Sequence, residues 1–516
     1  MRFLRTTPFK TLLCLLASTT LTSAAIKLPA IFGDHMVLQR QQFNPVWGQA
    51  DPGERITVRI NGQQATAYAG LDGRWKVKLK PMPAGGPYTL EVAGRQKLRF
   101  EDVMVGEVWL CSGQSNMKWS VAQSDGGDLE VTGAASAQLR MLSVPHYGSQ
   151  QAQWDFKGKW QSSNRWVAAS FSAVGYHFGQ RLQRALGVTV GLIDNAWGGS
   201  SAEAWLPREV LEAYPRYHSH LEEWDVKAAN YTDAMHAERV ANWRAWNANG
   251  RVGKAPPWPN HFRDGQQRPA NLYNGVLHPI IGYGMRGVIW YQGESNVARA
   301  SDYAHLFPLL ISTWREQWQQ GDFPFYWVQL ADYLAEPSAS QQRSAWAELR
   351  EAQTESLSVA NSGQAVIIDC GEGRDIHPRN KRTVADRLAR HALAKTYGFE
   401  LACESPRFAT LTLRDAAVEV RFEHVSAEGL YAFDVAEVQG FELAGADGSF
   451  YRARAEIVAK DRVRVVHPEI AEPTMLRYGW ADNPVVNLFD RNGLPVTPFR
   501  AEVVGDTTAE SVESAH

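Results

Sequence analysis

Hydrophobic and polar positions alternate at both ends of the chain, a pattern that is typical of half-buried β-strands. In residues 26–103 the alternating stretches are separated by turn-forming pairs such as Asn61-Gly62, which favour hairpins. The same alternation returns in residues 401–505. We therefore predict two β-rich segments of sandwich type, jelly-roll-like in character. The pattern leaves open whether they form one sandwich or two.

The middle of the chain, residues 104–400, shows another pattern, in which short apolar runs alternate with segments of helical period. The runs predict strands buried on both faces at 103–110, 139–144, 188–193, 286–291, 325–330 and 365–369. One apolar stripe from Phe171 to Leu186 and another over 378–397 predict amphipathic helices. This alternation predicts an α/β domain with a parallel sheet and helices on both sides. The stretch 208–275, rich in Trp, Asn, His and Pro, interrupts it as an insertion over one end of the sheet.

The first 25 residues have the pattern of a secretory signal peptide. Arg2, Arg5 and Lys10 precede a short leucine-rich run, and Ser23-Ala24-Ala25 supplies small residues for cleavage. We therefore expect a secreted or periplasmic protein. No later stretch reaches the roughly 18 apolar residues of a membrane helix, so no membrane association is expected after cleavage. Residues 506–516 are predicted to be a polar tail.

Composition and charge limit the kinds of binding partner and the number of disulfides that the protein can have. The formal net charge is −2 and there is no basic tract, which argues against nucleic acid as a partner. Hydrophobic residues make up 44% and charged residues 21%, as in folded globular proteins. Outside the leader the cysteines are Cys111, Cys370 and Cys403, which allow at most one disulfide, Cys370–Cys403. The sequence gives no indication of the oligomeric state.

Polar and glycine-rich segments follow four of the predicted strands, at 113–116, 195–200, 292–296 and 370–377. In parallel sheets, ligands bind at this carboxyl edge. Ser115 directly follows one strand and precedes a predicted helix, and His377 follows the last strand, so the two can meet as nucleophile and general base. The alternatives are that Ser115 only caps a helix and that His377 is structural.

Further donors and competitors lie in the same segments. Gly198 and Gly199 offer backbone N–H groups for an oxyanion hole, although a tight turn would also explain them. Gln292 and Asn296 could add side-chain donors or make ordinary loop hydrogen bonds.

Two other readings of these segments remain open. Ser295 is a competing nucleophile because Gly-Glu-Ser-Asn resembles Gly-Gln-Ser-Asn, and Glu294 is a candidate base or orienting acid. A metal site is the weaker alternative. Its candidate ligands include one histidine and no cysteine pair. These candidate ligands are Asp369, Glu372, Asp375 and His377.

Four motifs, in this order, resemble those of the sialate O-acetylesterase family of SGNH hydrolases, which includes bacterial esterases acting on plant hemicellulose. They are Gly-Gln-Ser-Asn-Met at 113–117, Trp-Gly-Gly-Ser at 197–200, Trp-Tyr-Gln-Gly-Glu-Ser-Asn at 290–296 and Asp-Ile-His-Pro at 375–378. The segments 477–484 and 493–495 are also similar, so the resemblance spans nearly the whole chain.

The resemblance implies a flavodoxin-like SGNH hydrolase domain without a metal or an organic cofactor. It implies Ser115 as nucleophile, His377 as base, and oxyanion donors from the Ser115 backbone N–H, Gly199 and Gln292 or Asn296. Many SGNH hydrolases place the acid three residues before the histidine, but Arg374 stands there in this chain. Asp375, two residues before, is the predicted acid, with Glu294 as the possible substitute.

These observations predict an exported serine esterase that removes O-acetyl groups from a carbohydrate through an acetyl-enzyme. The substrate would be an acetylated oligosaccharide or polysaccharide, either hemicellulose such as xylan or xyloglucan, or sialic acid. Sialic acid carries a carboxylate and would favour a basic pocket, whereas a neutral Trp-lined groove would favour hemicellulose. The alternatives are a non-catalytic carbohydrate-binding protein on an esterase scaffold and a peptidase or lipase.

Overall fold

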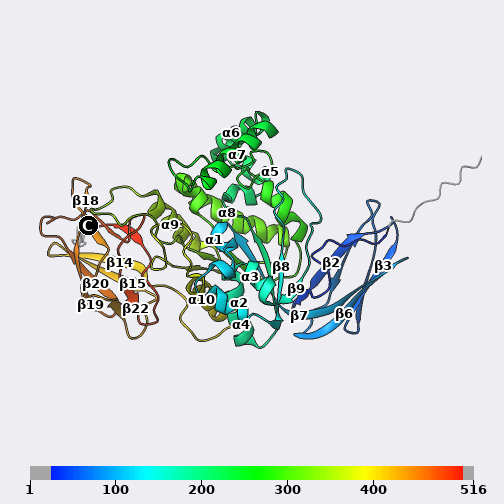
Figure 1. The fold of residues 1–516 in the computed structure, drawn as a ribbon. Helices are drawn as coiled ribbons and strands as arrows, with labels where there is room; N and C mark the ends of the chain where they lie inside the picture. Colours follow the sequence, from blue (N-terminus) through cyan, green and yellow to red (C-terminus); the bar gives the residue numbers. More distant parts are fainter. Residues whose placement is uncertain (1–24, 504–516) are drawn as a thin grey trace, which may run out of the picture.

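Three parts follow one another along the molecule in the computed structural model, which describes residues 25–503 (Figure 1). A β-rich part lies at one end, an α/β part in the middle, and a second β-rich part at the other end. The two β-rich segments are therefore separate, and the predicted fold class is confirmed. The predicted leader, apart from Ala25, and the polar tail lie outside the described residues. Within the described range, no helix has the length and apolar character needed to cross a membrane.

One long strand, β7 (Lys97–Gly113), belongs to both the first and the middle part. Its first half pairs with β6 and alternates between exposed and half-buried side chains, whereas every residue from Val103 to Gly113 is buried. The other strands of the first part are β1 (Val37–Gln39), β2 (Asn44–Gln49), β3 (Arg55–Ile60), β4 (Gln63–Tyr68), β5 (Arg74–Leu79) and β6 (Gly85–Ala93). A continuous backbone strand thus joins the two parts without a linker.

The central sheet has the strand order β13-β12-β11-β7-β10-β8-β9, and all pairs are parallel except β8 with β9. Besides β7, its strands are β8 (Ser136–Ser143), β9 (Gln161–Ser163), β10 (Val190–Ala196), β11 (Gly287–Tyr291), β12 (Phe325–Val328) and β13 (Ser362–Ala365). The last predicted strand, 365–369, was placed too late. Val366, Ile367 and Ile368 are buried but unpaired, because an apolar run reports burial rather than strand pairing.

Helices cover both faces of this sheet. The helices α4 (Ala173–Leu186) and α10 (Lys381–His391) contact each other on one face, and α8 (Ala300–Trp318) and α9 (Ala345–Glu355) do so on the other. Both predicted helices are present, and the second continues into a π-helical turn, η8 (Ala392–Thr396). Side-chain caps fix their starts: Ser172 accepts from the amide of Gly175, and Asn380 from that of Thr383.

The stretch predicted as an insertion forms three helices of its own. They are α5 (Arg208–Glu212), α6 (His218–Ala229) and α7 (Asp233–Ala248), and α6 and α7 lie above α8 in Figure 1. Three short helices belong to the middle part: α1 (Ser115–Lys118), α2 (Gly127–Thr132) and α3 (Arg165–Ser170).

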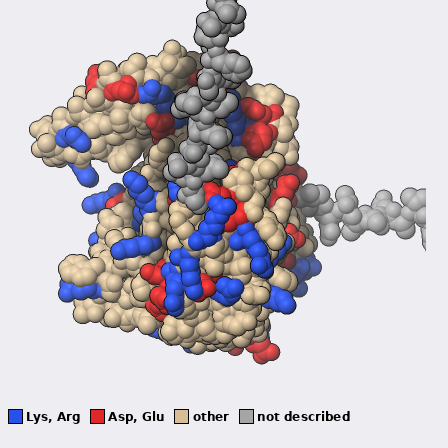
Figure 2. Space-filling view, turned by 90° about the vertical axis from the view of Figure 1, so that its right-hand side faces the viewer, with Lys and Arg blue, Asp and Glu red and all other residues tan. Residues whose placement is uncertain are grey.

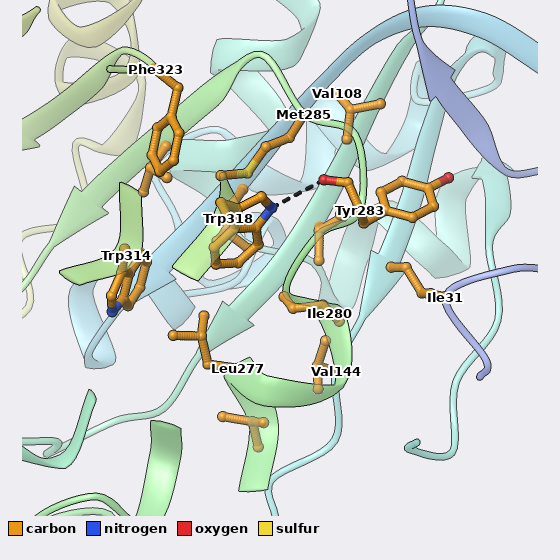
Figure 3. Packing of buried hydrophobic residues seen from close by; sticks show 14 of the residues in the cluster. Ile31, Val108, Val144, Leu277, Ile280, Tyr283, Met285, Trp314, Trp318 and Phe323 are labelled. Carbon is orange, nitrogen blue, oxygen red and sulfur yellow. Dashed lines mark hydrogen bonds between the residues drawn. The ribbon is translucent and has the colours of Figure 1, made fainter. Parts of the chain in front are cut away.

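One hydrophobic core runs from the first part into the α8 face of the sheet. Figure 3 shows Ile31 from the N-terminal segment in one cluster with Val108, Tyr283, and Trp314 and Trp318 of α8. The indole of Trp318 donates to the carbonyl of Tyr283 at 3.0 Å, so its polar atom is satisfied inside the core. Shared packing and the shared strand hold the first two parts together.

The last part has a core of its own, built on short antiparallel sheets. Its strands are β14 (Arg407–Arg414), β15 (Ala417–Glu423), β16 (Leu430–Ala432), β17 (Phe441–Ala444), β18 (Phe450–Arg452), β19 (Arg454–Ala459), β20 (Arg462–Val466), β21 (Met475–Tyr478), β22 (Leu488–Asp490) and β23 (Phe499–Glu502). Arg350 of α9 connects this part to the sheet. Its fully buried guanidinium donates to the carbonyls of Leu330, Ala331, Ala481 and Asp482 at 2.7–2.9 Å.

The predicted disulfide was wrong, because all three described cysteines are free. Cys370 lies in the loop after β13 beside Asp369 and Arg387, whereas Cys403 lies beside His391 and Glu404. On the face shown in Figure 2, acidic side chains lie among the basic ones, in keeping with the near-zero net charge.

We expect Arg350→Met to lower the free energy of unfolding by about 3 kcal/mol, because several buried carbonyls lose their donor at once. Arg500→Met is the matched control. Arg500 also joins α9 to the last part, through Glu351 at 2.7 Å, but its side chain is 47% exposed, so a loss of about 1 kcal/mol is expected. Urea unfolding of both variants measures the difference, and equal losses would contradict the role given to Arg350.

Candidate active site

Three parallel strands end at the same level, at Gly113. This residue pairs with Ala196 of β10 and with Tyr291 of β11, so the loops that follow all three strands leave the sheet together. Gly113 has φ +132°, and a Cβ on it would lie 2.2 Å from the carbonyl oxygen of Tyr291. Only glycine therefore allows β7 and β11 to approach this closely while the chain turns into α1.

Ser115 and His377 meet at this edge. Ser115 opens α1, and the Nε2 atom of His377 lies 2.8 Å from its Oγ. Ser295 lies in the same pocket, but the histidine contacts Ser115 instead. The structure thus brings together the two residues that the sequence paired.

Two groups hold the imidazole of His377. Its Nδ1 lies 3.2 Å from Oδ1 of Asp375, and its ring stacks on the indole of Trp119 with centroids 5.0 Å apart. The carboxylate of Asp375 is open to solvent, since its side chain is 54% exposed. Burial lowers the pKa of His377; Asp375 opposes this shift and the charge of Lys381 adds to it. The ring is therefore neutral at pH 7, as a proton acceptor must be.

Two glycines line the pocket together with Ser115. Gly198 lies against it, because a Cβ there would be 3.3 Å from the Cβ of Ser115. Gly199 has φ +74°, a conformation that favours glycine. Within the described residues, the amide N–H groups of Ser115 and Gly199 make no hydrogen bond, so both are available to a ligand.

Gln292 and Asn296 are not brought to Ser115. The amide of Gln292 donates to the carbonyl of Ser200 at 3.1 Å and to Oδ1 of Asn296 at 2.7 Å. Asn296 in turn donates to the buried carboxylate of Glu203 at 3.0 Å. Both residues are buried, and neither lines the pocket. They tie the loop after β11 to the loop that carries Gly198 and Gly199.

Glu294, the candidate base or orienting acid, contacts Asn116 and not the imidazole of His377. Its Oε1 accepts from the side-chain amide of Asn116 at 2.5 Å, its Oε2 has no hydrogen-bond partner, and burial raises its pKa. Asn116 in addition accepts from the Nζ of Lys381 at 2.5 Å. Lys381, Asn116 and Trp119 were given no role from the sequence, because contacts between distant loops leave no periodic signal.

Two of the four candidate metal ligands form ion pairs with arginines instead of facing a shared site. Asp369 pairs with Arg387, and Glu372 with Arg379. In the described chain, one group of three potential ligands lies within 4.8 Å of one another, at His391, Cys403 and Glu404. Lys395 forms an ion pair with Glu404 there, and none of the three lines the pocket.

A pocket of about 730 Å³ opens over Ser115 and His377. Its lining is rich in aromatic and uncharged polar side chains; the former include Trp119, Trp197 and Trp258, and the latter Asn260, Gln266 and Gln267. Trp258 and the three polar residues come from the stretch predicted as an insertion. Lys118 is the lysine of the lining, and its Nζ is 2.7 Å from Asp194.

Known proteins are similar to this chain over the α/β part that carries the pocket. The family described as "Carbohydrate esterase, sialic acid-specific acetylesterase" matches residues 105–237 and 266–394. The sialate O-acetylesterase of Mus musculus is 32% identical over 71% of this chain and 72% of its own, and that of Homo sapiens is 31% identical over 72% and 71%.

A solved structure extends the likeness beyond the α/β part. The crystal structure of a carbohydrate acetylesterase from Xanthomonas citri is 38% identical, with a TM-score of 0.78 over 92% of this chain and 99% of that one. The predicted family and enzyme class, a carbohydrate O-acetylesterase, are confirmed by these matches. The chain belongs to the sialic acid-specific acetylesterase family of carbohydrate esterases.

Proposed function

We propose that the protein is an exported serine esterase that hydrolyses O-acetyl esters of a carbohydrate, with Ser115 as nucleophile and His377 as base. The observation that carries this proposal is the 2.8 Å contact between Oγ of Ser115 and Nε2 of His377 in the pocket. As Ser115 attacks the acetyl carbonyl, His377 takes its proton, and the amides of Ser115 and Gly199 stabilise the oxyanion.

Collapse of the tetrahedral intermediate breaks the bond to the sugar oxygen, which receives the proton from His377 and leaves as a hydroxyl group. Water, activated by the same histidine, then releases acetate and regenerates Ser115. Asp375 accepts a hydrogen bond from the Nδ1–H group of His377 and stabilises the imidazolium. No step needs a metal or an organic cofactor. Retention of nucleophile, base and free oxyanion amides favours this enzyme over a non-catalytic sugar-binding protein on the same scaffold.

For the substrate, we propose an acetylated neutral polysaccharide such as xylan or xyloglucan. Three indoles line the pocket, and stacking on sugar rings is their common use at such sites. The lysine of the lining is neutralised by Asp194, so no free cation is available from the described lining for a sialic acid carboxylate. Sialic acid is the second candidate, because the mammalian relatives are sialate O-acetylesterases.

Export rests on the N-terminal pattern of residues 1–25 and implies a secreted or periplasmic location, where polysaccharides would be met. The mixed surface charge supports the expectation that nucleic acid and membranes are not partners.

Ser115→Ala should reduce turnover of p-nitrophenyl acetate by about 10⁴-fold to 10⁶-fold, because the attacking oxygen is lost. Ser295→Ala is the control: it removes a hydroxyl from the same pocket without touching His377 and should retain measurable activity. Initial rates of purified variants decide between the two serines. Full activity of Ser115→Ala would overturn the mechanism.

Asp375→Asn should lower kcat by about 10²-fold to 10³-fold, since it removes the charge that stabilises the imidazolium. We expect less than the roughly 10⁴-fold known for buried acids because Asp375 is largely exposed and water can substitute. Glu294→Gln, which keeps the size of a residue bound to Asn116, should cost less. A larger loss in Glu294→Gln, with both variants folded by circular dichroism, would reverse the two roles.

Acetate release from acetylated xylan, acetylated xyloglucan and O-acetylated sialosides tests the substrate. We expect higher kcat/KM on the neutral polysaccharides, and Trp258→Ala should lower it by roughly 10-fold, given the stacking contribution of an exposed indole. Preferred turnover of sialosides would show that the pocket recognises a carboxylate by another route.

A further inference from the structure

The side chain of Asn116 makes every hydrogen bond that its amide nitrogen can make. A lysine can only donate, so Oδ1 must face Lys381, whose Nζ lies 2.5 Å away. The two hydrogens on Nδ2 then go to Oε1 of Glu294 at 2.5 Å and to the carbonyl of Ile376 at 3.0 Å. One amide thereby links α1, the loop after β11 and the loop before α10.

These contacts lie one residue away from both members of the catalytic pair. Asn116 follows Ser115, and Ile376 precedes His377, so the hydrogen bond between them clamps the two backbones behind the reacting atoms. We propose that Asn116 and Lys381 are positioning residues that set the distance between Ser115 and His377; this inference rests on the function proposed above. Neither side chain lines the pocket, so neither touches the substrate there.

Lys381 reaches the histidine by a second route. Its ammonium lies 5.8 Å from the ring centroid of Trp119, which stacks on His377, and 5.4 Å from that of Tyr291. The lysine thus restrains both the main chain before His377 and the ring beneath it.

The burial of Lys381 is unfavourable for stability alone. Its side chain is fully buried at the first residue of α10, where the helix dipole disfavours a cation, and its Nζ donates to the amide oxygen of Asn116 rather than to a carboxylate. Burial lowers its pKa to about 7, although Glu294, Glu372, Asp375 and Cys370 all act in the opposite direction. A residue that costs stability here is explained by its effect on the site.

Three variants separate the donor from the charge. Lys381→Met removes both, Lys381→Gln keeps a donor for Asn116 without the charge, and Asn116→Ala keeps the charge without the clamp. With p-nitrophenyl acetate, we expect kcat to fall about 10-fold to 100-fold in Lys381→Met and Asn116→Ala, as misplacement of reacting groups does, with KM changed less than about 3-fold. Lys381→Gln should recover most of the loss.

The pH profile gives a readout that a purely structural role would leave unmoved. The groups facing His377 are Asp375 on its own loop, which raises its pKa, and Lys381 on α10, which lowers it. Removing the lysine charge makes the imidazolium easier to form, so the acid limb of kcat/KM should move to higher pH in both Lys381 variants. In Asn116→Ala, where the charge remains, the limb should stay.

Lys395→Met is the control, because Lys395 is an exposed lysine of the following turn that contacts Glu404 and not Asn116. It should keep both kcat and the acid limb. Thermal melts check that each variant is folded. Wild-type kcat in folded Lys381→Met and Asn116→Ala, with Ser115→Ala inactive, overturns the positioning role alone, whereas an active Ser115→Ala overturns the proposed function itself. Should Lys381→Met not fold, kcat of Asn116→Ala decides in the same way, and the acid limb of Lys381→Gln tests the effect of the charge.

Discussion

The common end level of three parallel strands is the constraint on which the site depends. Gly113 pairs with Ala196 and Tyr291, and its missing side chain lets β7 and β11 approach closely. Because all three strands stop there, Ser115, the glycines after β10 and the loop after β11 are delivered to one edge. A side chain at Gly113 would separate the strands and move each loop by a different amount, so the catalytic geometry is a property of sheet register.

The sequence predicted the residues whose chemistry is carried by identity and strand position. Ser115 and His377 follow predicted strands, and the structure places them in contact. Gln292 and Asn296 have the right chemistry at the right edge, but their amides face Ser200 and Glu203, a choice made by side-chain rotamers that the sequence does not encode locally. The predicted link between Cys370 and Cys403 was wrong because Cys370 follows β13 whereas Cys403 follows α10 and its π-helical turn, and the two face different neighbours.

The fold class was predictable because strands that are buried on both faces have apolar side chains throughout. The residues at which strand pairing ends were not predictable from the same pattern. At β13 the run Val366–Ile368 remains buried after pairing has ended, which displaced the predicted strand. The burial of Lys381 could not be predicted from the sequence for a related reason. In the predicted helix 378–397, a lysine at the first turn fits an exposed position, and its burial follows from the loops packed over it.

The way His377 is held bears on how much this esterase depends on its acid. A buried carboxylate orients a catalytic histidine strongly, because the low dielectric strengthens their attraction, but Asp375 is mostly exposed and its attraction is screened. Stacking on Trp119 and the main-chain clamp by Asn116 act through contact, which solvent does not weaken in the same way. In the proposed mechanism, packing fixes the orientation of the imidazole and the carboxylate mainly biases its charge, so an acid two residues before the histidine is compatible with the proposed roles of Ser115 and His377.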